Sequence, residues 1–276
     1  MDILNVDLLY SAFRVEVIFS DGAGTKTCSG TGFFVLDDQN IYLVTNRHVV
    51  DVKWNQPGKS KNHSDYFGFV LQDINCTGRP SGDSLRNFKL LNPNIIYSDQ
   101  YTDDVAVIPV RQIVTLDGSE QVTLDRGIPT NLFAPESLFN CSFEGINISD
   151  QITYPVYSAE TSNNDNRPAL RMGWIVSDPR YSLDMPEVKG SVLLTESFST
   201  AGASGAPVFV LPRGFRIAAG NGINISGDLY RPIYLVGVNA GHFKSSDHDH
   251  ANLSYAFKST VIMDCIRKAK AIEVAK

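Results

Sequence analysis

The stretch from residue 32 to residue 45 reads GFFVLDDQNIYLVT, two apolar runs that flank a short polar turn. This arrangement is typical of a β-hairpin, because Asp and Asn tolerate the backbone angles that reverse a chain. Just upstream, residues 14–19 alternate between polar and apolar side chains, as expected for a strand with one buried face. Residues 14–45 therefore predict antiparallel β-structure.

The same pattern continues along the chain. Short β-like runs separated by Gly, Pro, Asn and Asp occur at residues 66–71, 105–110, 192–195, 207–211, 233–238 and 253–257. No amphipathic helices alternate with these runs, so the sequence favours an all-β barrel or sandwich. Near the end, apolar residues recur every three or four positions from Val261 to Ile272 and predict one amphipathic helix, which we expect to pack on the second β unit.

Length and turn signals divide the chain into two units. With 276 residues it is long enough for one large domain or two smaller ones. Polar turn residues gather between Asp117 and Pro129 and predict a connector there. We expect a first β unit over residues 1–120, a second over 121–258 and a helix over 259–276.

Composition excludes several classes of function. The net charge of −6 argues against nucleic acid and anionic membranes as partners, because both need a basic binding surface. The segment from Met1 to Asp7 lacks the basic start and apolar run of a secretion signal, and no apolar stretch approaches the ~20 residues of a membrane span. These observations predict a cytoplasmic protein.

The four cysteines have neither CxxC pairing nor close Cys/His spacing; they are Cys28, Cys76, Cys141 and Cys265. Structural zinc sites and dense disulfide frameworks show such spacings. We therefore expect free thiols, no metal and no cofactor.

A Gly-x-Ser-Gly turn surrounds Ser204. Small residues on both sides let the backbone turn sharply and leave the hydroxyl exposed as a nucleophile. The amides of Gly202 and Ser204 are then expected to point at a developing oxyanion, where they stabilise the transition state. The same tetrapeptide also occurs in ordinary turns, so it does not establish catalysis alone.

The candidate base is His48, which follows an apolar run and is expected at the end of a strand. The unperturbed pKa of an imidazole is about 6.5, so a histidine side chain can take a proton from a serine at neutral pH and return it to a leaving amine. A structural histidine is the alternative. His63, in a polar loop, and His248 and His250, in a charged segment, fit the role less well.

Asp104 directly precedes the apolar run of residues 105–110, so its carboxylate is expected at the mouth of a buried strand. A buried carboxylate is stabilised when it accepts the imidazole N–H, and it then fixes the tautomer that faces the serine. Asp103 is the competitor. Alternation is expected to turn Asp103 to the opposite face, into solvent.

The chain order of these candidates, His48, Asp104 and Ser204, resembles the trypsin/chymotrypsin-like serine peptidases, and most closely the bacterial glutamyl endopeptidases and HtrA-type protease domains. The resemblance rests on residues 45–50, 104–107, 202–209 and 236–241. It implies two antiparallel six-stranded β-barrels of the chymotrypsin type. Base and acid then come from the first barrel, the nucleophile from the second, and the active site lies between them.

Two departures from the animal digestive enzymes are informative. Those enzymes have Asp immediately before the nucleophile, where it receives the N-terminus made by zymogen cleavage, whereas this chain has Ala203. The half-cystine commonly found after the catalytic His is replaced by Val49, which fits a reducing compartment. Any control must then come from loop ordering, a partner or the compartment.

The resemblance also implies the walls of the primary substrate pocket, which are Phe198, Ser199, Thr200, Asn239, Ala240, Gly241 and Tyr255. Phe198 stands roughly where trypsin has its acidic pocket base. Asn239 stands where glutamyl endopeptidases have a His. We therefore expect a neutral pocket for an apolar or small polar side chain.

Two neighbouring segments carry further expectations. The run from Tyr234 to Gly241 pairs with the substrate backbone in the family, and is otherwise simply a core strand. The loop over residues 244–250 is expected to overhang the pocket. It either reads substrate charge, binds a metal weakly through His248, His250 and an aspartate, or is a solvated loop.

The sequence thus predicts a serine endopeptidase that acts on polypeptides without a cofactor. One alternative is a catalytically silent relative that binds peptides or regulates. Another is a latent protease whose oxyanion loop is ordered by an activating protein partner. The sequence does not indicate an oligomeric state.

Overall fold

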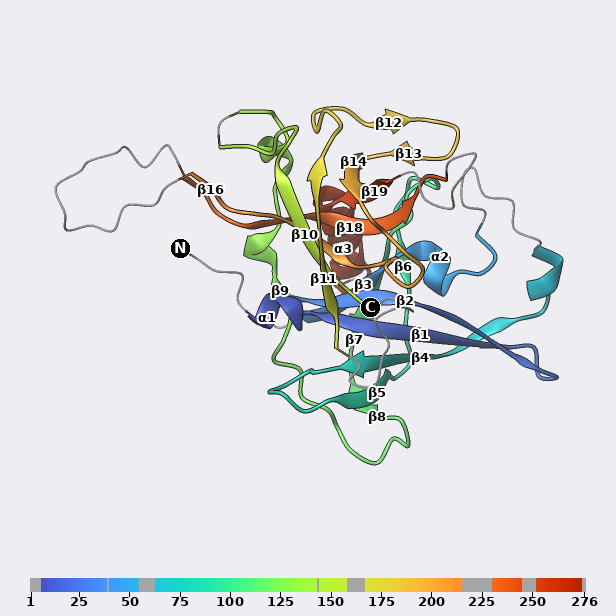
Figure 1. Ribbon diagram of the computed structural model, residues 1–276. Coiled ribbons are helices and arrows are strands. Elements are labelled where there is room, and N and C mark those ends of the chain that lie inside the picture. Colours follow the sequence, from blue (N-terminus) through green and yellow to red (C-terminus); the bar gives the residue numbers. More distant parts are fainter. Residues whose placement is uncertain are drawn as a thin grey trace.

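The computed structural model describes residues 6–38, 40–54, 63–142, 144–157, 167–214, 230–244 and 252–274. Two sets of β-strands follow one another along the chain, and a helix ends it. Figure 1 shows the strands of the first half (blue to green) below those of the second half (yellow-green to red). The mostly β architecture with a C-terminal helix confirms the predicted fold class.

One nine-stranded antiparallel sheet with a single parallel pair, β2 and β9, forms the first half. Its strands are β1 (Ala12–Ser20), β2 (Thr25–Asp37), β3 (Asn40–Thr45), β4 (Val70–Gly78), β5 (Arg86–Leu90), β6 (Ile96–Tyr97), β7 (Ala106–Val110), β8 (Ile113–Thr115) and β9 (Ile128–Pro129). Their order is β6-β7-β3-β2-β1-β4-β5-β8, with β9 paired to β2. This path ends at β6 and β8 among the described residues, so a closed six-stranded first barrel stays a prediction.

The second half contains a closed six-stranded barrel, as predicted. Its order is β10-β11-β14-β19-β18-β15. These strands are β10 (Gln151–Val156), β11 (Ala169–Ile175), β14 (Val192–Ser197), β15 (Pro207–Val210), β18 (Tyr234–His242) and β19 (Leu253–Lys258). Two short hairpins accompany it, β12 (Leu183–Asp184) with β13 (Lys189–Gly190), and β16 (Arg213–Gly214) with β17 (Tyr230–Arg231).

Alternation places the core residues of the first half. In β1, Phe13, Val15, Val17 and Phe19 point inward and are buried. The Phe13 ring meets the Phe34 ring edge to face at a centroid distance of 4.9 Å. Such pairs add stability beyond area burial, and this one joins β1 to the first strand of the hairpin at residues 32–45.

The predicted strand at residues 66–71 is wrong. Residues up to Tyr66 form a 3₁₀ helix, η1 (His63–Tyr66), and the strand begins only at Val70. Gly68 has a φ of +82°, which no extended strand allows. The aromatic rings of Tyr66 and Phe69 pack against each other and under the Lys26 ammonium, so apolar residues gather here without a strand.

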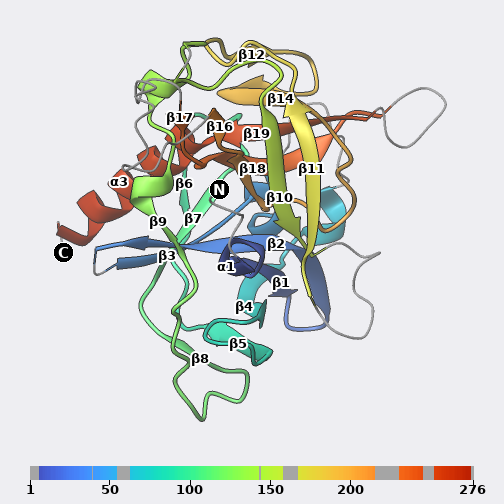
Figure 2. The same ribbon diagram turned by 60° about the vertical axis from the view of Figure 1, so that its left-hand side comes forward.

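The C-terminal helix α3 (Ser259–Val274) packs on both halves rather than on the second alone. Its buried residues Val261, Ile262 and Ile266 share one cluster with Val107 of β7 and Val238 of β18. Figure 2 shows α3 at the side of the molecule, at the level where the two sets of strands meet. The helix therefore packs on β7 of the first half as well as on the second unit, where it was expected.

The remaining helices are short: α1 (Val6–Leu9), α2 (Arg47–Val50), η2 (Thr130–Leu132) and η3 (Glu136–Leu138). In the described part of the chain, no helix has the length and apolar character required to cross a membrane. All four cysteines are free thiols, of which Cys76 and Cys265 are buried.

Candidate active site

His48 and Asp104 lie together at the end of two neighbouring strands. His48 is in α2, just after β3, and Asp104 precedes β7, which pairs with β3. The His48 Nδ1 atom is 2.6 Å from Asp104 Oδ2, and the His48 backbone N–H donates to Asp104 Oδ1 at 2.9 Å. Because both carboxylate oxygens accept from one residue, the ring is held with its Nδ1 toward Asp104 and its Nε2 left for another partner.

The Asp104 carboxylate is 1% exposed, while the His48 side chain is 18% exposed. Asn46 also fixes Asp104, because its Nδ2 donates to the Asp104 backbone carbonyl at 2.7 Å. A buried acid beside a partly open imidazole is the arrangement a general base requires: the acid orients the ring, and the ring still reaches substrate.

Asp103 is not in solvent, contrary to the expectation from alternation. It is 4% exposed and accepts a hydrogen bond from Ser98 Oγ at 2.7 Å. Residues 102–105 precede β7 and are not extended as a strand, so the period-two rule does not apply to them. Burial raises the pKa of Asp103, and the Ser98 hydrogen bond offsets only part of that shift.

A cation surrounded by aromatic rings supports this pair, which sequence reasoning did not find. The Arg47 guanidinium carbon lies 5.3 Å, 4.4 Å and 5.1 Å from the ring centroids of Trp54, Tyr97 and Tyr101. The Arg47 Nε atom also donates to Asp51 at 3.2 Å. Arg47 therefore ties the helix that bears His48 to the loop that leads to Asp104. The sequence signal that could have revealed this role of Arg47 is the presence of three aromatic residues in the segments on either side.

The Ser204 loop connects β14 to β15 and is seated on β2 of the first half. Thr31 N–H donates to the Ser204 carbonyl at 2.7 Å, and Thr31 Oγ1 donates to the Gly202 carbonyl at 2.7 Å. Thr45 Oγ1 in turn donates to the Thr31 carbonyl at 2.8 Å. Since Thr45 is three residues before His48, these bonds bring the Ser204 loop beside the candidate base.

Close backbone approach at two glycines shows the same proximity. A Cβ on Gly30 would lie 2.9 Å from the Ser204 carbonyl oxygen and 3.0 Å from a methyl group of Val49, the residue after His48. Gly205 has a φ of +89° and is more crowded still, because a Cβ there would lie 1.9 Å from the Thr31 carbonyl oxygen. In the described part of the chain, Ser204 Oγ makes no hydrogen bond to His48; such contacts are often long in unliganded sites and tighten when substrate binds.

Two backbone amides of this loop have no acceptor among the described residues, and they are Gly202 N–H and Ser204 N–H. Their neighbours are satisfied, because Ala203 N–H donates to Thr200 and Gly205 N–H donates to Asn239. Free amides at two alternate positions around a serine can bind a negatively charged oxygen. They are the two amides that the sequence predicted for an oxyanion hole.

The structure brings together several of the predicted pocket residues. Asn239 is 2% exposed, and its Nδ2 donates to Ser199 Oγ and to the Ala203 carbonyl, both at 3.0 Å. Its amide hydrogens are thus occupied by the protein rather than by a substrate. Phe198 is 45% exposed, and the Arg171 guanidinium carbon lies 5.7 Å from its ring centroid.

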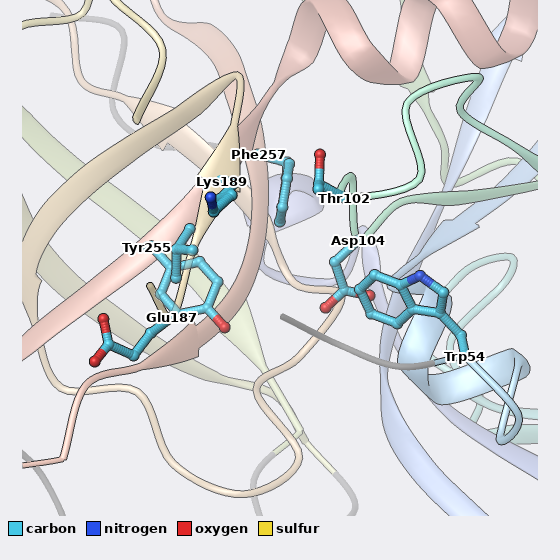
Figure 3. Close-up of a pocket in the computed structure, with 8 residues that line it drawn as sticks. Trp54, Thr102, Asp104, Glu187, Lys189, Tyr255 and Phe257 are labelled. Atoms are coloured by element: carbon cyan, nitrogen blue, oxygen red, sulfur yellow. The ribbon is translucent and has the colours of Figure 1, made fainter. Parts of the chain in front are cut away.

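The predicted pocket residues Ala240, Gly241 and Tyr255 lie deeper. Ala240 is fully buried, and a Cβ on Gly241 would lie 2.8 Å from the Tyr255 hydroxyl. Tyr255 lines a hollow of about 10 Å³ together with Trp54, Thr102, Asp104, Glu187, Val188, Lys189 and Phe257. Figure 3 shows Tyr255 on one side of this hollow and Asp104 with Trp54 on the other. It has room for about one water molecule beside the acid.

No cluster of three or more His, Cys, Asp or Glu side chains that could hold a metal occurs among the residues with assigned structure. The weak metal site considered at His248 and His250 lies outside the described residues. Residues 245–250 of the loop expected over the pocket also lie outside them. The side chain of His63 also lies outside them.

No family model and no curated protein sequence matches the chain. Solved structures do match. The thermostable serine protease AL20 from an extremophilic microorganism has a TM-score of 0.53 at 15% identity, over 95% of this chain and 98% of its own. The Rv3671c protease in its inactive form has a TM-score of 0.52 at 15% identity, over 95% and 90%. Its active form, from M. tuberculosis, also has a TM-score of 0.52 at 15% identity, over 95% and 82%. The chain therefore has the trypsin-like serine protease fold.

Proposed function

We propose that this protein is a serine endopeptidase that uses His48, Asp104 and Ser204 as its catalytic triad. The observation that carries the proposal is the 2.6 Å contact between His48 Nδ1 and Asp104 Oδ2 beside a Ser204 loop with two free amides. The serine protease fold of the solved neighbours supports the same chemistry.

The proposed reaction proceeds in two steps. His48 Nε2 takes the Ser204 proton while Ser204 Oγ attacks the substrate carbonyl carbon, and the Gly202 and Ser204 amides stabilise the oxyanion. Collapse of this intermediate breaks the C–N bond, and His48 gives the proton to the leaving amine. A water molecule, deprotonated by His48, then hydrolyses the acyl ester and restores Ser204.

We also propose a neutral primary pocket for an apolar or small polar side chain. Phe198, Ser199 and Asn239 have uncharged side chains, and Asn239 Nδ2 donates to Ser199 Oγ. A cytoplasmic location is proposed as well, because the four cysteines are unpaired thiols. Cell fractionation with an antibody to the chain tests the location.

The test of the main proposal is labelling with a fluorophosphonate probe. We expect the wild-type protein to be labelled and Ser204→Ala to remain unlabelled at equal folding, as judged by circular dichroism. Cleavage of a casein or peptide library by wild type alone would extend the result from reactive serine to endopeptidase. Equal labelling of both proteins, or none under any condition, would remove the enzyme claim.

A silent or latent relative is the second candidate. It is favoured by one observation, the lack of a Ser204–His48 hydrogen bond in the described structure. Such a protein would bind peptides equally well with and without Ser204→Ala. A latent protease would become labelled only after a protein partner is added.

A further inference from the structure

We propose that Thr31 is a positioning residue that holds the Ser204 loop in its oxyanion-binding form, in place of a charged anchor. The inference rests on the proposed function of Ser204 and adds a residue that no motif of the sequence points to. Thr31 is in β2, is fully buried and belongs to the half of the chain opposite Ser204.

The three consecutive carbonyls around Ser204 all have donors. Thr31 Oγ1 donates to the Gly202 carbonyl and Thr31 N–H to the Ser204 carbonyl, each at 2.7 Å. Asn239 Nδ2 donates to the Ala203 carbonyl at 3.0 Å. With its carbonyls bound to protein, the loop leaves the Gly202 and Ser204 amides without an acceptor in the described structure.

The direction of the Thr31 hydroxyl proton follows from its other partner. Tyr157 N–H donates to Thr31 Oγ1 at 3.1 Å, and a backbone N–H can act only as a donor. The single hydroxyl proton must therefore go to the Gly202 carbonyl. Tyr157 follows β10 of the second half, so one hydroxyl joins three separate segments and is oriented by two of them.

This arrangement replaces an ion pair by neutral hydrogen bonds. Ala203 has no side-chain charge that could anchor the loop, and it is 1% exposed. A flipped loop would leave the Thr31 hydroxyl and the Gly202 carbonyl unpaired in a buried place, which is unfavourable. The packing of the two halves thus holds the loop through uncharged groups.

The variant Thr31→Val tests the role, because valine keeps the shape and loses only the hydroxyl. We expect its fluorophosphonate labelling rate to fall about tenfold, measured at a pH where the rate has reached its plateau. This is less than the effect of about 10²–10³-fold from deleting an oxyanion donor outright. The midpoint of the rate against pH should not move, since the His48–Asp104 pair is untouched. Thr31→Ser should keep the rate within about threefold of wild type.

The matched control is Thr153→Val. Thr153 is also fully buried, and its Oγ1 donates to the Arg171 carbonyl at 2.9 Å and makes no hydrogen bond to the Ser204 loop among the described residues. Both valine variants lose one buried hydroxyl, so both should melt earlier, but only Thr31→Val should label slowly. Equal labelling rates for the two variants would overturn the inference.

A second measurement does not depend on activity. Amide hydrogen exchange over residues 199–206 reports opening of the loop, because Ala203, Gly205 and Ala206 donate internal hydrogen bonds. Thr31→Val should speed this exchange about tenfold, while Thr153→Val should leave it unchanged. If the wild-type protein fails to label, the proposed function falls; if exchange is not accelerated, the role of Thr31 falls, whatever the probe shows.

Discussion

Replacing Gly205 by alanine measures how tightly the Ser204 loop is seated on the first half of the chain. Gly205 has a φ of +89°, and an added Cβ would lie 1.9 Å from the Thr31 carbonyl oxygen and 2.4 Å from Thr45 Oγ1. The first neighbour is backbone and cannot rotate away. Because real Cβ contacts stay beyond 3.0 Å, the loop must withdraw by about 1.1 Å.

A withdrawal of that size acts mainly on the chemistry. Misplacing a catalytic group by 1 Å lowers rates by about 10²-fold, and the left-handed φ destabilises an alanine by roughly 1 kcal/mol. We expect Gly205→Ala to react with the fluorophosphonate at least about 100-fold more slowly than wild type. Its far-ultraviolet circular dichroism should be unchanged, with a lower melting temperature.

The variant Gly22→Ala separates the effect of the positive φ from the effect of the steric clash. Gly22 has a φ of +86°, but a Cβ there would meet nothing within 4 Å. This control carries the same backbone penalty without the clash, so it should melt earlier and label normally. If Gly205→Ala and Gly22→Ala label at the same rate, the seating of the loop on Thr31 does not position Ser204.

Three further predictions concern the base, its helix and the neighbouring acid. Asp104→Asn should fold but label about 10⁴-fold more slowly in probe kinetics, because an amide favours the wrong His48 tautomer. Arg47→Met should lose about 1 kcal/mol of stability in denaturant unfolding and label more slowly, and Arg47→Lys should recover part of both, since lysine retains the cation–π contacts. Asp103→Asn should melt above wild type at pH 7, and the gap should shrink toward about pH 4. In the unfolded chain the pKa of Asp103 is 3.8, and in the folded protein it is higher, so the folded protein binds the proton more tightly. The stability of the wild type therefore falls as the pH rises above the unfolded pKa. A difference in melting temperature between variant and wild type that does not change with pH would contradict this.

Sequence patterns predicted the strands and hairpins that depend on neighbouring residues alone. The hairpin of residues 32–45 is β2 and β3, and the runs at 207–211 and 253–257 are strands of the closed barrel. Alternation and turn residues determine such elements locally. The same reasoning placed a strand at 66–71, where a glycine with positive φ and packed aromatic rings make a different structure.

Two of the barrel strands, β10 and β11, escaped the analysis of the sequence. In β11 the large apolar residues face solvent, with Leu170, Met172 and Trp174 each 42–50% exposed, while Gly173 and Ile175 face inward. The alternation of β11 therefore marks the wrong face as buried. Closure of the barrel, a long-range property, decides which face is inside.

The residues of the proposed triad could be chosen from the sequence because each lies in a motif, but the residues that support them could not. Thr31 and Arg47 act through contacts with residues far along the chain, such as Gly202 and Tyr101. The solvent placement of Asp103 was wrong for a related reason, since a loop before a strand does not follow its alternation. Pairings between distant segments are decided by tertiary packing.

The seating of the Ser204 loop on Thr31 would make the proposed catalysis depend on how closely the two halves stay together. Concentrations of urea too low to melt either β unit would let the halves part slightly and so release the carbonyls of the loop from the Thr31 groups that donate to them. Inactivation would then precede unfolding, and enzyme assays would sense weakening of the contact between the halves before any spectroscopic signal changed.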